Sequence, residues 1–185
     1  MALTWARIAF IPLIVGVFYV PDALVSPHMK NVLACIMFII AAITDALDGY
    51  IARNYNMATM MGAFLDSVAD KLVVCSAIVV LLAFDRVDMI VALIIVGREI
   101  AVTALREWMA KIGAAATVKV NWFGKIKTIA QMTAIPMLLF FDPFFGIDIY
   151  LVGTVLIWVA AVLTVYSMFV YMSAAWPHIE GGDAN

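Results

Sequence analysis

The sequence predicts an all-α membrane protein in which six helices span the bilayer and residues 1–185 form a single domain. Hydrophobic residues make up 66% of the chain and charged residues only 13%, and no soluble core requires so large an apolar fraction. The apolar residues also fall into six long stretches. Because a helix needs about 20 such residues to cross the hydrocarbon core, six spans account for almost the whole chain.

Turn-forming and polar residues separate each apolar stretch from the next. The breaks are, in order, Pro21 to Pro27, Asn54 to Asn56, Asp85 to Asp88, Gly113 to Asn121 and Asp142 to Asp148. The predicted spans are residues 3–21, 31–53, 59–84, 88–110, 122–141 and 148–174.

The basic residues predict the side of the membrane that each loop faces. With a cytoplasmic N-terminus, nine of the 11 Lys and Arg residues fall inside, whereas Lys30 and Arg86 fall outside. We therefore expect both termini and the loops after the second and fourth spans in the cytoplasm. The net charge of -2 argues against a nucleic-acid partner. The nine inside residues are Arg7, Arg53, Lys71, Arg98, Arg106, Lys111, Lys119, Lys125 and Lys127.

Four aspartates interrupt the apolar sequence of the second and third spans. Asp45 and Asp48 are three residues apart and Asp66 and Asp70 are four apart, so each pair lies on one helix face. The short break between the two spans predicts an antiparallel hairpin. All four carboxylates can then converge on one pocket at the cytoplasmic side.

The cost of these carboxylates in a bilayer predicts a metal site. An Asp at the centre of a spanning helix costs about 2.5 to 3.5 kcal/mol, so four of them need positive partners. An all-oxygen ligand set without His or Cys nearby selects hard ions, and four carboxylates can share two ions. We therefore predict Mg²⁺ or Mn²⁺, held by Asp45, Asp48, Asp66 and Asp70.

Small residues and one arginine accompany the acids. Gly49 follows Asp48, Gly62 lies one turn before Asp66, and Ala52 and Arg53 end the second span. The absence of side chains lets the phosphates of a ligand approach the backbone, although small residues also serve helix packing in lipid. Arg53 suits a diphosphate, or it anchors the span at the interface.

These residues form the pattern D-x-x-D-G-x-x-A-R, eight residues, G-x-x-x-D-x-x-x-D, which resembles the signature of the CDP-alcohol phosphotransferases. The resemblance implies a six-helix fold, usually a homodimer, with a pocket that opens to the cytoplasmic leaflet. It also implies that Asp45, Asp48 and Asp66 bind metal and the cytidine diphosphate, and that Asp70 is metal-associated and acts as general base.

Further segments extend the resemblance over nearly the whole chain. Thr4 and Arg7 match the end of an N-x-x-T-x-x-R pattern that relatives carry, with Met1 at the Asn position. The segments GAFLDSVADK, GREIAVTALREWMA and WFGKIKTIAQM are similar to those of family members that transfer a phosphatidyl group from CDP-diacylglycerol to glycerol 3-phosphate. We therefore expect the inner membrane of a bacterium as the location. The donor-binding residues are expected to be Thr4, Arg7, Asp45, Asp48, Gly49, Arg53, Gly62 and Asp66.

A cationic group on the fourth and fifth spans predicts the site for the phosphate of the acceptor. Arg98 and Arg106 are eight residues apart and share a helix face, and Lys125 opens the fifth span at the same side. The alternative is that Arg98 pairs with Glu99 or an aspartate, Arg106 pairs with Glu107, and Lys125 anchors the span. Neighbouring helix positions point apart, which disfavours those local pairs. Lys71, Lys119 and Lys127 are less favoured contributors.

Two other functions remain open at this point. The same reaction with another acceptor, such as inositol phosphate or a second phosphatidylglycerol, uses the same aspartates. A cation or proton transporter would also carry carboxylates within the membrane. The four acids gather at one face without a second acidic layer toward the other face, which disfavours transport.

Overall fold

The computed structural model describes residues 2–55, 60–113, 122–144 and 146–182. Side chains are not described within these ranges for residues 2–4, 6, 46, 48–55, 60, 63, 123–125 and 178–182.

Six α-helices and one short 3-10 helix make up the described part of the chain, which contains no β-strand beyond an isolated bridge between Phe144 and Ile147. The predicted all-α fold is therefore confirmed. The elements are α1 (Ala2–Gly16), η1 (Val17–Tyr19), α2 (Pro27–Tyr55), α3 (Met60–Ala83), α4 (Met89–Lys111), α5 (Trp122–Phe140) and α6 (Ile149–Gly182).

Two helices extend beyond the apolar stretches that predicted them. Helix α2 begins at Pro27 rather than residue 31, because Pro is favourable in a first turn and the Ser26 hydroxyl accepts a hydrogen bond from the Met29 amide at 3.3 Å. Helix α6 continues to Gly182 rather than residue 174. Hydropathy marks the part of a helix that suits lipid, and polar residues prolong the helix beyond it.

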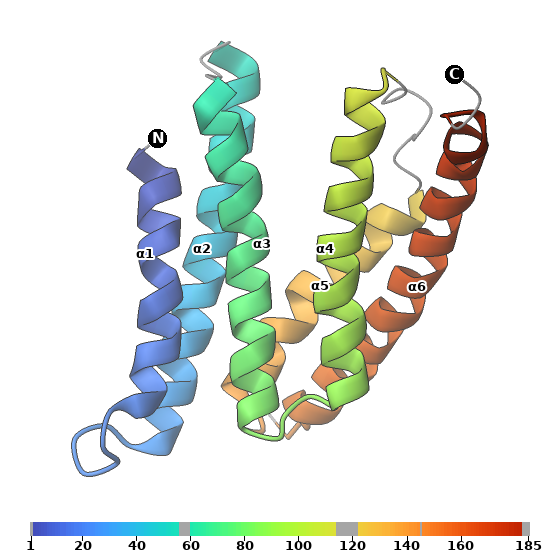
Figure 1. Ribbon diagram of the computed structural model, residues 1–185. Coiled ribbons are helices and arrows are strands. Elements are labelled where there is room, and N and C mark those ends of the chain that lie inside the picture. Colours follow the sequence, from blue (N-terminus) through green and yellow to red (C-terminus); the bar gives the residue numbers. More distant parts are fainter. Residues whose placement is uncertain (1, 56–59, 114–121, 145, 183–185) are drawn as a thin grey trace.

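The helices alternate in direction along the chain (Figure 1). The starts of α1, α3 and α5 and the ends of α2, α4 and α6 lie toward one end of the bundle, which we name the site end. Helix α1 packs against α2 and α3, and α4 packs against α6. Helix α5 runs obliquely behind the others in Figure 1 and contacts both α2 and α6, so it joins the two halves of the bundle.

Side chains from all six helices form one buried apolar cluster. Ile14, Phe38 and Ile78 supply the part from α1 to α3, and Ile95, Leu138 and Ile157 supply the part from α4 to α6. Each of these six side chains is at most 2% exposed. This core fixes the positions of the six helices relative to one another, and the same helices carry the charged residues at the site end.

An arginine connects several helices at the end of the bundle opposite the site. Arg86, in the connection between α3 and α4, donates to the Asn31 side chain at 2.7 Å and to the Leu139 carbonyl at 2.9 Å. Its guanidinium also lies 4.5 Å from the centre of the Phe141 ring. Lys30 is buried there and bonds to Asp22. Both basic residues predicted to lie on the non-cytoplasmic side are thus held by internal contacts.

Two helical segments among the described residues are long and apolar enough to cross a membrane. They are Pro27–Asp45 and Ile149–Pro177, with mean hydropathies of 1.5 and 2.2. The outward faces of other helices are also apolar, since Leu93 and Ile100 on α4 are 72% and 66% exposed. Such large exposed apolar faces suit contact with lipid. The count of six spans stays a prediction.

Candidate active site

Three helices bring charged side chains together at the site end. Asp45 lies on α2, Asp66 lies on α3, and Arg7 of α1 stands between them. One nitrogen of Arg7, Nη1, lies 2.7 Å from Asp45 Oδ1 and 2.9 Å from Asp66 Oδ1. The Arg7 side chain is almost completely buried, and a buried charge requires such partners. The two helices predicted to carry the metal ligands therefore bring Asp45 and Asp66 together, with Arg7 between them.

This geometry tests whether the carboxylates fit the predicted metal. Asp45 and Asp66 each direct one oxygen at the same cationic nitrogen, so both can approach a single positive charge. Carboxylate oxygens are the donors that Mg²⁺ and Mn²⁺ prefer, and the donor set fits a hard ion in its chemistry. Among the residues whose side chains are described, no three His, Cys, Asp or Glu are grouped closely enough to hold an ion.

Several predicted site residues lie outside the described side chains. Asp48, Gly49 and Arg53 belong to the last two turns of α2, Thr4 to the first turn of α1, and Lys125 to the first turn of α5. Their backbones are therefore at the site end, together with Gly62 near the start of α3. Their predicted roles remain predictions.

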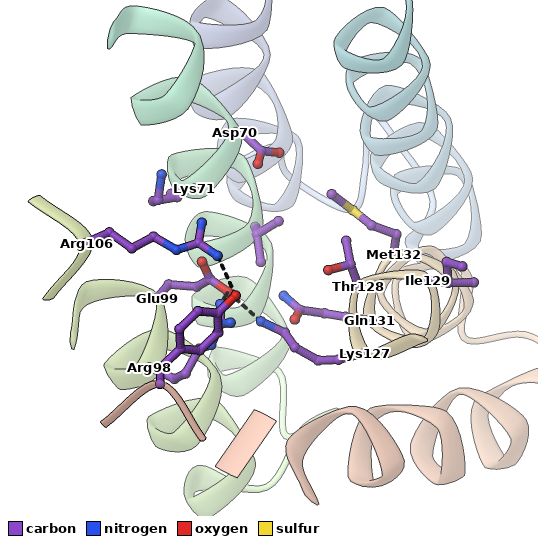
Figure 2. A pocket seen from close by; sticks show the side chains of 12 residues that line it. Asp70, Lys71, Arg98, Glu99, Arg106, Lys127, Thr128, Ile129, Gln131 and Met132 are labelled. Atoms are coloured by element: carbon purple, nitrogen blue, oxygen red, sulfur yellow. Dashed lines mark hydrogen bonds and ion pairs between the residues drawn. The ribbon is translucent and has the colours of Figure 1, made fainter. Parts of the chain in front are cut away.

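A cavity of about 460 Å³ lies beside the aspartates, between α3, α4, α5 and α6 (Figure 2). Its volume is within the range of small-molecule sites, about 300 to 1,000 Å³. Asp70, one turn along α3 from Asp66, lines this cavity. The charged residues of the wall are Asp70, Lys71, Arg98, Glu99, Arg106 and Lys127.

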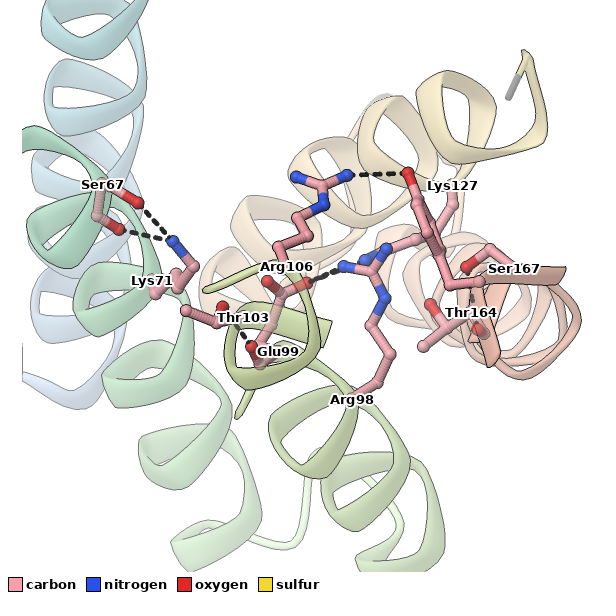
Figure 3. Close-up of polar contacts among 10 residues, drawn as sticks. Ser67, Lys71, Arg98, Glu99, Thr103, Arg106, Lys127, Thr164 and Ser167 are labelled. Carbon is pink, nitrogen blue, oxygen red and sulfur yellow. Dashed lines mark hydrogen bonds and ion pairs between the residues drawn. The ribbon is translucent and has the colours of Figure 1, made fainter. Parts of the chain in front are cut away.

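One carboxylate oxygen joins two of these cations. Glu99 Oε1 accepts from Arg98 Nη1 at 2.9 Å and from Lys127 Nζ at 2.8 Å (Figure 3). Arg98 therefore pairs with Glu99, contrary to the prediction from helical spacing, because these side chains are long enough to bend toward each other although their Cβ atoms diverge. Lys127, which is 3% exposed, needs the carboxylate as a partner and comes from another helix.

Arg106 is held by an aromatic residue of α6. Its Nη2 donates to the Tyr171 hydroxyl at 2.7 Å, and the guanidinium lies 5.0 Å from the centre of the Tyr171 ring. The expected alternative partner, Glu107, pairs instead with Lys111 at 3.0 Å. Arg98 and Arg106 both line the cavity, so the prediction that they share a helix face is confirmed.

The sequence interpretation ranked Lys127 below Lys125 as a contributor to this wall and did not name Tyr171. The position of Lys127 four residues before Gln131 on one face of α5 was the available signal. Tyr171 lies in an apolar helix far from every motif, and no local pattern marks it.

The site agrees with a comparison against known families. The sequence model for the CDP-alcohol phosphatidyltransferases matches residues 1–166. The chain belongs to this family. It is also similar along most of its length to proteins named CDP-diacylglycerol–glycerol-3-phosphate 3-phosphatidyltransferase. The relative from Salmonella choleraesuis is 43% identical, with 94% of this chain and 92% of the relative covered. Those from Shigella flexneri serotype 5b and Yersinia enterocolitica are 44% and 43% identical with the same coverage.

The family region contains the aspartates and nearly all of the cavity. Arg7, Asp45, Asp66 and Asp70 lie within residues 1–166, as do all four cations of the cavity wall. Tyr171 lies beyond that region, on the same helix α6 that the family region enters. This phosphatidyltransferase chain therefore holds Arg106 with a residue outside the matched segment.

Proposed function

We propose that this chain transfers the phosphatidyl group of CDP-diacylglycerol to glycerol 3-phosphate, which forms phosphatidylglycerol phosphate and releases CMP. One observation carries the proposal above all. Asp70 belongs to the aspartate pattern of the family and also lines a cavity with four cations. A donor bound at the aspartates and a phosphorylated acceptor in the cavity would therefore meet at Asp70. The printed names of the relatives support the same reaction.

The donor would bind at the site end of α1, α2 and α3. Asp45, Asp48, Asp66 and Asp70 would hold two Mg²⁺ or Mn²⁺ ions, whose charge offsets that of the diphosphate and of the developing transition state. Thr4, Arg7, Arg53 and the small residues Gly49 and Gly62 complete this part. The diacyl chains of the donor can stay in the surrounding lipid, since only the headgroup has to reach the aspartates.

The acceptor would bind in the cavity with its phosphate among the cations. Lys71, Arg98, Arg106 and Lys127 contribute four positive charges to the wall, and Asp70 and Glu99 contribute two negative charges. The excess of two positive charges matches the dianion of a phosphomonoester. Guanidinium groups add charge-assisted and partly bidentate hydrogen bonds to phosphate oxygens. Lys125 remains a proposed contributor from the first turn of α5.

The transfer itself requires one proton to move. Asp70 would take the proton from the primary hydroxyl of the acceptor, and the oxygen would form a bond to the phosphorus that bears the diacylglycerol. The bond from that phosphorus to the CMP oxygen breaks, and CMP leaves. Positioning and neutralisation of charge supply most of the rate enhancement in phosphoryl transfer, which fits a cavity in which six of the twelve lining residues are charged.

The test is the release of CMP by the purified protein in lipid nanodiscs that contain CDP-diacylglycerol and Mg²⁺. Glycerol 3-phosphate, inositol phosphate and phosphatidylglycerol are supplied in turn, with an acceptor-free control. We expect glycerol 3-phosphate to give the highest rate and a phosphatidylglycerol phosphate product. A higher rate with another alcohol would reassign the acceptor, and the absence of CMP release with all three would contradict the proposed reaction.

We also propose that the protein is integral to a bacterial inner membrane, with six spans, both termini and the active site at the cytoplasmic side, and two copies per assembly. The two long apolar helices and the apolar outer faces of the bundle support the membrane location. The homodimer rests on the resemblance to the family alone. The mass of the protein in nanodiscs tests it, since a single copy per particle would contradict a dimer.

A further inference from the structure

One polar side chain of the cavity has no role in the scheme so far. Gln131 on α5 is 4% exposed and lines the cavity. It has no hydrogen-bond or ion-pair partner within the chain as far as the structure describes it. Figure 2 shows its amide extending from α5 into the cavity, beside Lys127. The amide atoms are open to the cavity rather than enclosed by protein, so a ligand bound there can reach them and form hydrogen bonds with them.

We expect Gln131 to lie near the middle carbon of the proposed acceptor. The phosphate end is assigned to Arg98, Arg106 and Lys127, and the reacting hydroxyl is assigned to Asp70 on α3. A three-carbon chain between these two ends would run along the part of the cavity wall that α5 contributes. The uncharged polar residues of that wall are Thr128 and Gln131, and Thr128 already has another interaction.

We propose that Gln131 determines specificity by hydrogen bonding the hydroxyl on the middle carbon of the acceptor. The assignment rests on the proposed use of glycerol 3-phosphate. An amide carries both donors and an acceptor, so it can bond a hydroxyl in either direction without a change in its own charge. A site with such a group also rejects an analogue that lacks the hydroxyl, because the amide is then left unpaired.

The experiment compares glycerol 3-phosphate with 3-hydroxypropyl phosphate, which keeps the phosphate and a primary hydroxyl and lacks the middle hydroxyl. CMP release is measured for the wild type and for Gln131→Met, whose side chain is similar in length and has no amide. The wild type is expected to prefer glycerol 3-phosphate by about five- to tenfold in kcat/KM, the effect of one hydrogen bond. Gln131→Met is expected to lose this preference, through a lower kcat/KM for glycerol 3-phosphate alone.

Two controls separate specificity from structure. Thr133→Val removes a polar group from the same helix at an exposed position outside the cavity, and it should keep the wild-type preference. Gln131→Ala repeats the test with a smaller side chain. Equal losses with both acceptors would assign Gln131 a structural role and overturn the proposal. A wild type without preference would overturn it without any variant, whereas a wild type that releases no CMP would overturn the proposed reaction itself.

Discussion

Arg7 illustrates how one buried side chain can organise three helices. Its Nη1 atom bonds the carboxylates of Asp45 and Asp66, which are themselves 32% and 38% exposed. Two carboxylates this close repel each other, so the arginine stabilises the site in the absence of other cations. Removal of either carboxylate is expected to be destabilising, because the positive charge of the buried Arg7 then loses one of these partners. The same repulsion explains why these acids suit a site for divalent ions.

The first prediction concerns the residues proposed as metal ligands. Asp45→Asn and Asp66→Asn are each expected to lower turnover more than about 100-fold, because even the loss of an outer partner of a ligand costs about 10- to 100-fold. Chelation of the metal should inactivate the wild type reversibly. The measurement is CMP release with and without added Mg²⁺.

The matched control for these variants is Asp85→Asn, at the opposite end of the bundle. Asp85 has a positive φ of 54°, which Asn tolerates, so this variant should fold and keep wild-type turnover. Wild-type rates in Asp45→Asn or Asp66→Asn, or activity in excess chelator, would contradict the metal assignment.

The second prediction separates Asp70 from the other acids. Asp70→Asn is expected to lower turnover about 10²- to 10⁴-fold, the usual contribution of a general base, and to leave binding of CDP-diacylglycerol largely intact. The measurements are single-turnover CMP release and donor binding to the same preparation. If donor affinity falls in parallel with rate, Asp70 is chiefly a metal ligand and another group accepts the proton.

At the scale of the elements, α6 joins the site through a contact that the sequence did not reveal. Its apolar pattern predicted a span and gave no reason to single out Tyr171. The residue is 4% exposed and forms the partner of Arg106 across the α4–α6 interface. Contacts between helices that are distant in sequence leave no local spacing to read. By contrast, the approach of Asp45 to Asp66 was predictable, because the short break between the two spans predicted an antiparallel hairpin.

The third prediction tests this contact. Tyr171→Phe keeps the ring beneath the Arg106 guanidinium and removes the hydroxyl that accepts its hydrogen bond. We expect KM for glycerol 3-phosphate to rise about three- to tenfold, with little change in kcat or in KM for the donor. Tyr150→Phe, near the start of the same helix, is the control and should have wild-type constants. An unchanged acceptor KM in Tyr171→Phe would exclude a positioning role for Tyr171.

The fourth prediction concerns the packing of α5, which carries Lys127 and Gln131. A Cβ atom at Gly153 of α6 would lie 3.0 Å from Leu138 Cγ and 3.1 Å from Met137 Cβ. Leu138 is fully buried and cannot move aside easily. Gly153→Ala should therefore lower the thermal unfolding midpoint, since overpacking costs about 1 to 3 kcal/mol and outweighs the gain of about 0.5 to 1 kcal/mol from better helix propensity.

Gly97→Ala, on helix α4, is not expected to lower the thermal unfolding midpoint. No atom lies within 4 Å of a Cβ placed at Gly97 of α4, so only the gain in helix propensity remains. Its unfolding midpoint should equal or exceed that of the wild type. Equal midpoints for the two variants would contradict the close α5–α6 approach.

At the scale of the whole molecule, hydropathy predicted the number and order of the described helices, and the aspartate motif predicted that Asp45 and Asp66 lie close together. The ends of α2 and α6 were less predictable, because polar residues continue a helix beyond its apolar part. The cavity was predictable only in part. Arg98 and Arg106 followed from helical spacing, whereas Lys127, Glu99 and Tyr171 acquire their roles from the way α4, α5 and α6 come together.

The last prediction concerns the orientation of the bundle in the membrane. The basic residues Lys30 and Arg86 at the end opposite the site are bonded internally, so that end presents little free positive charge and is expected to face away from the cytoplasm.

The test is the labelling of single cysteines from outside the cell. They are introduced after Cys35→Ala and Cys75→Ala, and intact spheroplasts are treated with a membrane-impermeant maleimide. Leu24→Cys, in the exposed connection before α2, should be labelled in intact spheroplasts. Ala110→Cys, exposed near the end of α4, should be labelled only after the membrane is opened. Val162→Cys on the apolar outer face of α6 serves as the control and should stay unlabelled in both, since lipid covers it. Labelling of Ala110→Cys and not of Leu24→Cys in intact spheroplasts would reverse the orientation and place the active site outside.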